Sequence, residues 1–214
     1  VEELHALRDK NAFVFDTQYM QNPKPLAGLM YEHEWKTYDM IPFTGHRKVK
    51  NYTDTADEGS DYLCSIDYVE TDHGNYVLDV LFTQKPMEYT EVATAQMLTR
   101  DGVEEANIES NNGGRGFARN VEKQCRVMGN NTTRIKWFHQ NANKEARIFT
   151  RSAEVQNLTY FPIGWKTMWP DFAHALEYHI KVGRNRHDDA PDALTGTIEM
   201  RPRNGRRANA SDFL

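Results

Sequence analysis

The sequence has little cysteine and no long hydrophobic run, and both absences limit what this protein can be. Cys64 and Cys125 are the two cysteines among 214 residues, too few for a disulfide framework and without metal-site spacing. We therefore expect a reducing compartment. No apolar stretch approaches the ~18 residues of a membrane span, so we expect no membrane partner. The P-loop pattern G-x-x-x-x-G-K-[ST] is also absent, which excludes that type of nucleotide site within these residues.

The composition nevertheless supports a folded domain. Ten Phe, ten Tyr and four Trp, with hydrophobic residues at 39%, provide enough apolar surface for a core and exclude a disordered chain. The length suits one domain, alone or with an arm. The formal net charge of -5 argues against a protein surrounded by nucleic acid only if charge is spread evenly, and here acidic and basic residues are clustered. A DNA-binding function therefore stays open.

The chain divides into three parts by pattern. Residues 1–47 show no sustained alternation, and Pro23 and Pro25 interrupt regular structure, so we interpret this part as an arm or linker. Its aromatic residues, Trp35 among them, must pack on something. Residues 48–200 carry regular periodicity and are predicted to form the domain. Residues 201–214 are polar and rich in arginine, and we expect a flexible basic tail.

The periodicity in the middle part predicts an α/β fold. Strands over 49–55, 62–70 and 75–84 have short connections and form an antiparallel meander. Further strands are expected over 104–110 and 133–140, and helices over 87–102, 115–128, 143–156, 170–183 and 187–200, with a short extended piece at 158–164. Helices between the third, fourth and fifth strands imply parallel crossovers. The prediction is a mixed five-stranded sheet flanked by helices, an order shared by ribonuclease-H-like folds.

Two acidic groups lie where strands end. Asp54, Asp57, Glu58 and Asp61 fall within eight residues after the first strand, a costly arrangement unless water or a cation compensates it. For Asp57 and Glu58 we favour a solvated turn, whereas the sheet holds Asp54. Glu109 ends the fourth strand, and ligands of open α/β sheets bind at that end of the strands. A polar residue at a strand exit is also common without a ligand.

The third acidic group opens the last helix, in HDDAPDAL. Asp189 as N-cap and Asp192 as a capping-box acid would explain two of its acids. A third acid, Asp188, together with His187, is more than capping requires. Combined with Asp54 and Glu109, these acids suit Mg²⁺ or Mn²⁺, which prefer carboxylate oxygens. Two such ions about 3.5–4 Å apart can support phosphodiester cleavage, and we expect Asp54 to bridge them.

Basic residues gather around this acidic centre. Arg115, Arg119, Lys123 and Arg126 recur at helical spacing opposite an apolar stripe, either as a solvated face or as a track for DNA phosphates. Further candidates for phosphate contacts open the next helix or flank the HDD segment, and they are Lys144, Arg147, Arg184 and Arg186.

Four segments together resemble the nuclease domain of phage terminase large subunits, over about residues 10–200. They are DTADEGSDY, IESNNGGRGFAR, NKEARI and HDDAPDAL, and the arm motif FDTQYMQNP is similar to the segment that joins the ATPase motor of that family to its nuclease. The resemblance implies metal ligation and catalysis by Asp54, Glu109 and Asp189, with Asp61 as a secondary acid and Asp192 as the second acid of a D-x-x-D arrangement. Which of Asp188, Asp189 and Asp192 binds metal directly stays open.

The expected function is a metal-dependent endonuclease that cuts concatemeric double-stranded viral DNA with two Mg²⁺ or Mn²⁺ ions. The resemblance implies a host-cytoplasmic protein whose partners are an ATPase domain, a portal and a small terminase subunit. Residues 1–47 would then lead from the motor. A Holliday-junction resolvase-like nuclease and a non-catalytic DNA-binding module of the same fold are the alternatives.

Overall fold

The computed structural model describes residues 28–42, 45, 47–56, 61–111, 114–183, 185 and 187–202. Most of the expected arm, the basic tail beyond residue 202, Asp57 and Glu58, and the predicted DNA contacts Arg184 and Arg186 lie outside these ranges.

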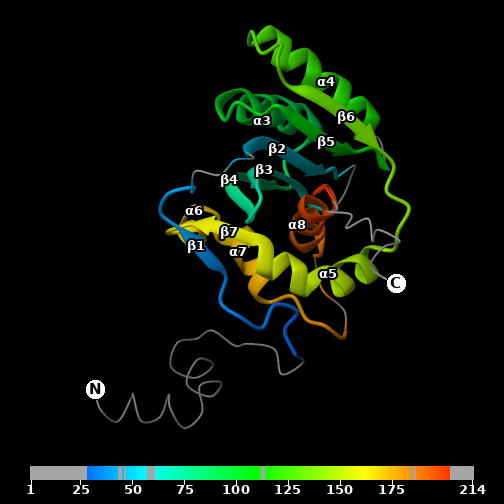
Figure 1. Ribbon diagram of the computed structural model, residues 1–214. Helices are drawn as coiled ribbons and strands as arrows, with labels where there is room; N and C mark the ends of the chain where they lie inside the picture. Colours follow the sequence, from blue (N-terminus) through cyan, green and yellow to red (C-terminus); the bar gives the residue numbers. More distant parts are fainter. Residues whose placement is uncertain are drawn as a thin grey trace, which may run out of the picture.

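A seven-stranded mixed sheet forms the centre of the fold, in the order β1-β7-β4-β3-β2-β5-β6 (Figure 1). The strands are β1 (Lys36–Tyr38), β2 (Arg47–Asp54), β3 (Leu63–Thr71), β4 (Gly74–Thr83), β5 (Glu105–Glu109), β6 (Arg134–Phe138) and β7 (Thr159–Pro162). The predicted antiparallel meander is β2-β3-β4, and the predicted parallel strands are β5 beside β2 and β6 beside β5. The predicted α/β class, with a mixed sheet flanked by helices, is therefore confirmed.

Helices cover both faces of the sheet (Figure 1). They are α3 (Met87–Arg100), α4 (Gly114–Val127), α5 (Lys144–Leu158), α6 (Trp165–Met168), α7 (Pro170–Glu177) and α8 (Asp189–Glu199). One core cluster packs Ile108 of β5 against Leu98 of α3 and Phe117 of α4. The other packs Tyr52 of β2 against Leu194 of α8 and the helices around it. Alternate residues of β2 and β5 thus face different helical layers, as the period of a strand requires.

The predicted strand count of five was wrong, because β1 and β7 extend the sheet at one edge. These strands have three and four residues, too short to show an alternating pattern. The helix predicted over 170–183 also ends early, at Glu177. The backbone beyond it pairs with an earlier segment instead, since the Met30 N–H donates to the His179 carbonyl and the Lys181 N–H to the Gly28 carbonyl.

Parts of the expected arm and tail are built into this body. Trp35 is buried and packs edge-on against Phe161 of β7, with ring centroids 5.4 Å apart. At the other end, Arg201 donates to the Asn75 side chain at 2.6 Å and to the Thr71 carbonyl at 2.8 Å. Among the described residues, no helix has the length and apolar character needed to cross a membrane.

Candidate metal centre

Two neighbouring parallel strands bring Asp54 and Glu109 together. Thr53 of β2 pairs with Ile108 of β5, so the next residue of each strand lies at the same carboxyl edge of the sheet. Helix α8 runs beside this edge and contributes Asp192. One carboxylate oxygen from each of Asp54, Glu109 and Asp192 lies within 4.8 Å of the other two. All three residues are buried, with 8%, 3% and 1% of their surface exposed.

Two glycines allow the elements to approach this closely. A Cβ on Gly196 of α8 would lie 2.0 Å from the ring of Tyr52, so the helix rests directly on that side chain. A Cβ on Gly114, the first residue of α4, would lie 2.1 Å from the Glu109 carbonyl oxygen. Real Cβ atoms do not occur at such distances. The acids of α8 and the start of α4 therefore reach the strand ends only because these positions have no side chain.

Tyr52 and Arg147 hold two of the acids in place. The Tyr52 hydroxyl donates to Glu109 Oε1, and burial, followed by the nearby Glu109 charge, raises the pKa of Tyr52 and keeps this donor protonated. Arg147 Nη1 lies 3.6 Å from Glu109 Oε1 and 3.0 Å from Asp192 Oδ1, and its Nη2 lies 2.9 Å from Glu199 Oε2. Because Arg147 is only 5% exposed, the predicted contact with DNA phosphate does not fit its position.

Lys144 lies among the acids of α8. Its Nζ is 3.0 Å from Asp189 Oδ1, 3.1 Å from Asp54 Oδ2, 3.2 Å from Asp188 Oδ1 and 3.6 Å from Asp192 Oδ2. Burial lowers the pKa of Lys144, but the surrounding carboxylates outweigh it and raise that pKa overall, so the ammonium stays charged. The Lys144 side chain is 33% exposed, and Lys144 is the first residue of α5, at the rim of the site. Arg147, by contrast, is enclosed.

The cluster carries more negative charge than these two cations neutralise. The acids paired with Lys144 or Arg147 are Asp54, Glu109, Asp188, Asp189, Asp192 and Glu199, an excess of four negative charges when all are ionised. Burial, opposed by Lys144 and supported by Glu109, raises the pKa of Asp54 to about 7. Burial likewise raises the pKa of Asp192 to about 8, against the attraction of Lys144 and Arg147.

Two buried oxygens of this cluster lack a hydrogen-bond partner among the described residues, Asp54 Oδ2 and Asp192 Oδ1. Each lies near a cationic nitrogen at ion-pair distance, but neither contact has hydrogen-bond geometry. Buried carboxylate oxygens are costly without a donor or a cation. Hard oxygen ligands, excess negative charge and two buried acceptors without a hydrogen bond together suit a divalent cation such as Mg²⁺ or Mn²⁺.

Helix capping does not account for the acids of α8. The N-cap is Asp188, whose side chain makes no capping hydrogen bond. Asp189 instead accepts from the Tyr62 backbone N–H, at 3.1 Å through Oδ2, and its other oxygen faces Lys144. The helix therefore presents its acids to the strand ends rather than to its own backbone.

The site forms a hollow of about 250 Å³. Its walls include five of the six predicted metal ligands, namely Asp54, Asp61, Glu109, Asp189 and Asp192. The sixth, Asp188, reaches the cluster through Lys144. Sequence reasoning missed Tyr52, although it lies two residues before Asp54 and so shares a strand face with it. The inward roles of Lys144 and Arg147 were also missed, because their spacing matches a solvated helix as well.

The predicted DNA-contacting face of α4 is exposed at Arg115, Arg119, Lys123 and Arg126. The buried side of the same helix carries Phe117, Val121 and Cys125, as predicted. Arg126 pairs with Glu122 at 2.6 Å, and the Arg115 guanidinium lies 5.7 Å from the centroid of the Trp137 ring. Since α4 begins beside Glu109, the start of this face lies near the carboxylate site, and contact of the face with DNA stays a prediction.

No protein-family model and no curated protein matches the chain. Solved structures match its fold. The human cytomegalovirus terminase nuclease domain gives a TM-score of 0.53 at 12% identity, over 74% of this chain and 86% of that chain. A mutant nuclease domain of the large terminase subunit gp2 of bacterial virus Sf6, with manganese and beta-thujaplicinol, gives 0.50 at 12% identity, over 72% and 88%.

The large terminase of a thermophilic bacteriophage, in complex with ADP, gives a TM-score of 0.50 at 13% identity. That match covers 92% of this chain but 51% of the phage terminase. This chain therefore has the fold of terminase nuclease domains.

Proposed function

We propose that this protein is a metal-dependent endonuclease, the nuclease part of a viral DNA-packaging terminase. The observation that carries the proposal is the convergence of Asp54, Glu109 and Asp192 at one edge of the sheet, buried and insufficiently neutralised. The burial of three acids so close together costs stability. A reaction that requires a bound cation would explain why these three acids lie together.

The donor set suggests how two divalent ions would be held. Asp54, Glu109 and Asp192 would hold one ion, and the geometry favours Asp192 over Asp189 as the third ligand of that position. Asp189, Asp188 and Asp61, with Asp54 as the bridging group, would serve a second ion. When bound, the ions would supply Lewis-acid activation of water and neutralise charge on the phosphate oxygens.

In the proposed reaction, a water oxygen forms a bond to the phosphorus and the bond from phosphorus to the 3′ oxygen breaks. The products are a 3′-hydroxyl end and a 5′-phosphate end. Tyr52 and Arg147 would keep Glu109 and Asp192 oriented throughout, because both are buried and paired. The Lys144 side chain is partly exposed at the rim, and once bound cations neutralised the acids it would be free to contact a phosphate of the cleaved strand.

The likeness in fold to terminase nuclease domains supports double-stranded DNA as the substrate. The large terminase of the thermophilic bacteriophage is about twice as long as the part that matches here, which supports an ATPase domain as the partner of this chain. On the same basis we propose cutting of concatemeric DNA in the host cytoplasm, together with a portal and a small terminase subunit.

A plasmid-cleavage assay tests the proposal. With Mg²⁺ or Mn²⁺, the wild type should convert supercoiled plasmid to nicked and linear forms, and chelation should stop it. Glu109→Gln and Asp192→Asn should lose most cleavage while staying folded. Asp72→Asn, an acid in the exposed β3–β4 turn, is the matched control and should cut normally.

Wild-type cleavage by folded Glu109→Gln would reject the assigned site. DNA binding without cleavage under any divalent cation would instead identify a binding module. A preference for four-way junctions over linear duplex would favour a resolvase.

A further inference from the structure

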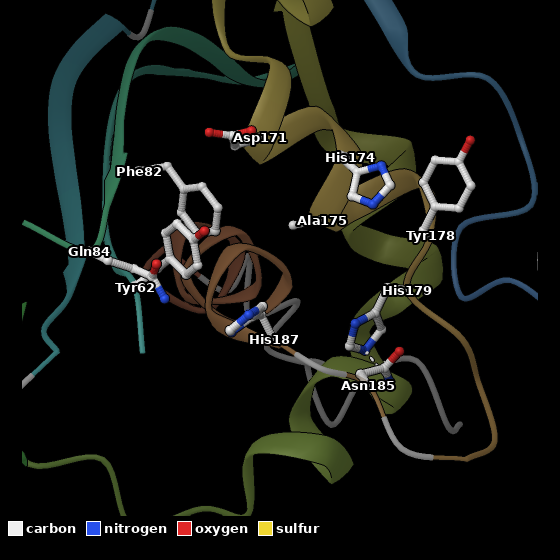
Figure 2. A pocket seen from close by; sticks show the side chains of 10 residues that line it. All are labelled: Tyr62, Phe82, Gln84, Asp171, His174, Ala175, Tyr178, His179, Asn185 and His187. Atoms are coloured by element: carbon white, nitrogen blue, oxygen red, sulfur yellow. Dashed lines mark hydrogen bonds between the residues drawn. The ribbon is translucent and has the colours of Figure 1, made fainter. Parts of the chain in front are cut away.

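Figure 2 shows a second cavity, of about 290 Å³. It is bounded by Tyr62, the end of β4, helix α7 and the segment that leads into α8. Its volume is at the lower end of the roughly 300–1,000 Å³ usual for small-molecule sites. The space therefore suits one flat ring system better than an extended ligand.

Two aromatic pairs form opposite walls. Tyr62 and Phe82 stack with ring centroids 4.2 Å apart and planes 10° apart, and His174 and Tyr178 lie 4.3 Å apart at 30°. Figure 2 shows the first pair on one side of the cavity and the second on the other, with the small side chain of Ala175 between them. Aromatic side chains on two sides of the cavity, with a small residue between them, leave a slot against whose apolar lining a planar ring can pack.

The described lining residues offer aromatic, imidazole and amide groups, which suit a neutral ring. The described lining residues include one carboxylate, Asp171, and neither lysine nor arginine. Burial lowers the pKa of His179, which favours its neutral form. A bound cation does not explain the histidines, because the described residues that could hold a metal are Asp54, Glu109 and Asp192, outside this cavity.

The cavity and the carboxylate site share a wall. The Tyr62 backbone N–H donates to Asp189 Oδ2 at 3.1 Å, while the Tyr62 ring lines the cavity. His187 packs edge-on against that ring, with centroids 5.0 Å apart, and directly precedes Asp188 of the acidic cluster. Tyr62 and the His187–Asp188 step therefore connect the cavity to the carboxylate site, so a nucleoside next to a phosphate bound at the carboxylates could enter the slot.

We infer that this cavity binds one unstacked nucleobase of the strand to be cut, next to the scissile phosphate. The inference rests on the proposed nuclease function. Binding in the slot would require the strand to be locally opened at the cleavage point, because a base inside a duplex is stacked and paired with its neighbours. Because every base has an aromatic face, the slot would accept all four bases and would hold the strand rather than select a sequence.

The probe for this inference is 2-aminopurine deoxyriboside 5′-monophosphate, a fluorescent nucleotide, with Ca²⁺ in place of a cleavage-supporting ion. The wild type should quench its fluorescence saturably as the base stacks. Ala175→Leu fills the slot and should weaken binding roughly 5- to 150-fold, the range expected for one base–aromatic stack. Ala153→Leu, the same change on an exposed position of α5, should bind like the wild type.

A second variant and a second ligand isolate the base. Tyr62→Leu removes one wall but keeps the backbone N–H that holds Asp189, and it should also weaken the quench. Deoxyribose 5-phosphate, which lacks a base, should bind equally to the wild type, Ala175→Leu and Ala153→Leu. Equal weakening of both ligands, or an unchanged quench in folded Ala175→Leu, would overturn the slot.

Ca²⁺ stabilisation separates the two proposals. If Ca²⁺ raises the melting temperature of the wild type but the probe is not quenched, the metal centre stands and the base slot is rejected. If the probe is quenched through Ala175 and Tyr62 but Ca²⁺ does not stabilise the protein, the slot stands and the metal centre is rejected.

Discussion

Replacing Lys144 with methionine tests whether this side chain neutralises the acidic cluster. The change keeps most of the side-chain length and removes one positive charge from the neighbourhood of four carboxylates. A single ion pair at about 3 Å has a gross attraction of roughly 5 kcal/mol at an effective dielectric constant of about 20. Desolvation offsets most of that, and removing one partner of a buried pair costs about 3–5 kcal/mol net.

Because the Lys144 side chain is 33% exposed, solvent screens part of the interaction. We therefore expect a loss of about 1–3 kcal/mol without divalent ions at about pH 8, a fall in melting temperature of roughly 3–10 °C. At about pH 6 the loss should be less than half of this, since Asp54 and Asp192, with pKa values of about 7 and 8, are largely protonated there.

With divalent ions present, the loss of the Lys144 charge should strengthen ion binding instead of only destabilising the protein. An ion that no longer competes with the ammonium should bind Lys144→Met more tightly, by about 5- to 150-fold if the same 1–3 kcal/mol is recovered. Isothermal titration calorimetry with Mn²⁺ and melting curves with and without the ion measure both effects. Lys136→Met is the matched control, because Lys136 pairs with Glu105 at the surface and should change stability by less than about 1 kcal/mol. Unchanged stability and unchanged Mn²⁺ affinity in Lys144→Met would refute the neutralising role.

Three further outcomes are expected. Without divalent ions the wild type should lose stability as pH rises from about 4 to 8, because the folded pKa values of Asp54 and Asp192 exceed their unfolded values. Saturating Mn²⁺ should remove that loss. A series of melting curves checks this, and in the same series Asp192→Asn should show a weaker pH dependence. Gly196→Ala should cost about 1–3 kcal/mol by overpacking against Tyr52, whereas Gly116→Ala, where a Cβ meets nothing within 4 Å, should be neutral or stabilising in the same unfolding assay. Changing Arg115, Arg119 and Lys123 together to alanine should weaken the binding of duplex DNA independently of its sequence. The slope of the logarithm of the binding constant against log salt should fall by roughly 0.9 for each phosphate that is no longer neutralised. Slopes equal to those of the wild type on two unrelated duplexes would show that α4 does not contact the DNA.

Patterns between neighbouring residues were sufficient to predict the central strands and to place Asp54 and Glu109 at strand ends. The apolar and β-branched residues of β2, β3 and β4 and the short turns between these strands are visible in the sequence, although both faces of β3 and most of β2 are buried. The positions of Asp54 and Glu109 follow from where two strands end. Their mutual proximity required one further step, the parallel pairing of β2 with β5, and the intervening helices imply that pairing.

The edge strands and the details of the site could not be predicted in this way. β1 and β7 are too short for periodicity, and their pairing joins segments more than a hundred residues apart. Asp188, Asp189 and Asp192 fall within one helical turn or next to it, so spacing alone does not rank them. The orientation of α8 about its own axis decides which of these acids lies next to Asp54 and Glu109. Because Gly196 has no side chain, α8 can lie directly against the Tyr52 ring.

The sequence by itself therefore determined the α/β class, the antiparallel meander and the presence of an acidic centre at strand ends, because each depends on neighbours along the chain. Only the tertiary structure decided that Arg147 turns inward, that Lys144 lies between four carboxylates and that Asp192 joins Asp54 and Glu109. The physical reason is that a charged side chain takes the position in which the charges of groups distant in sequence best compensate its own. That balance is set by distances through space, which residue spacing does not contain.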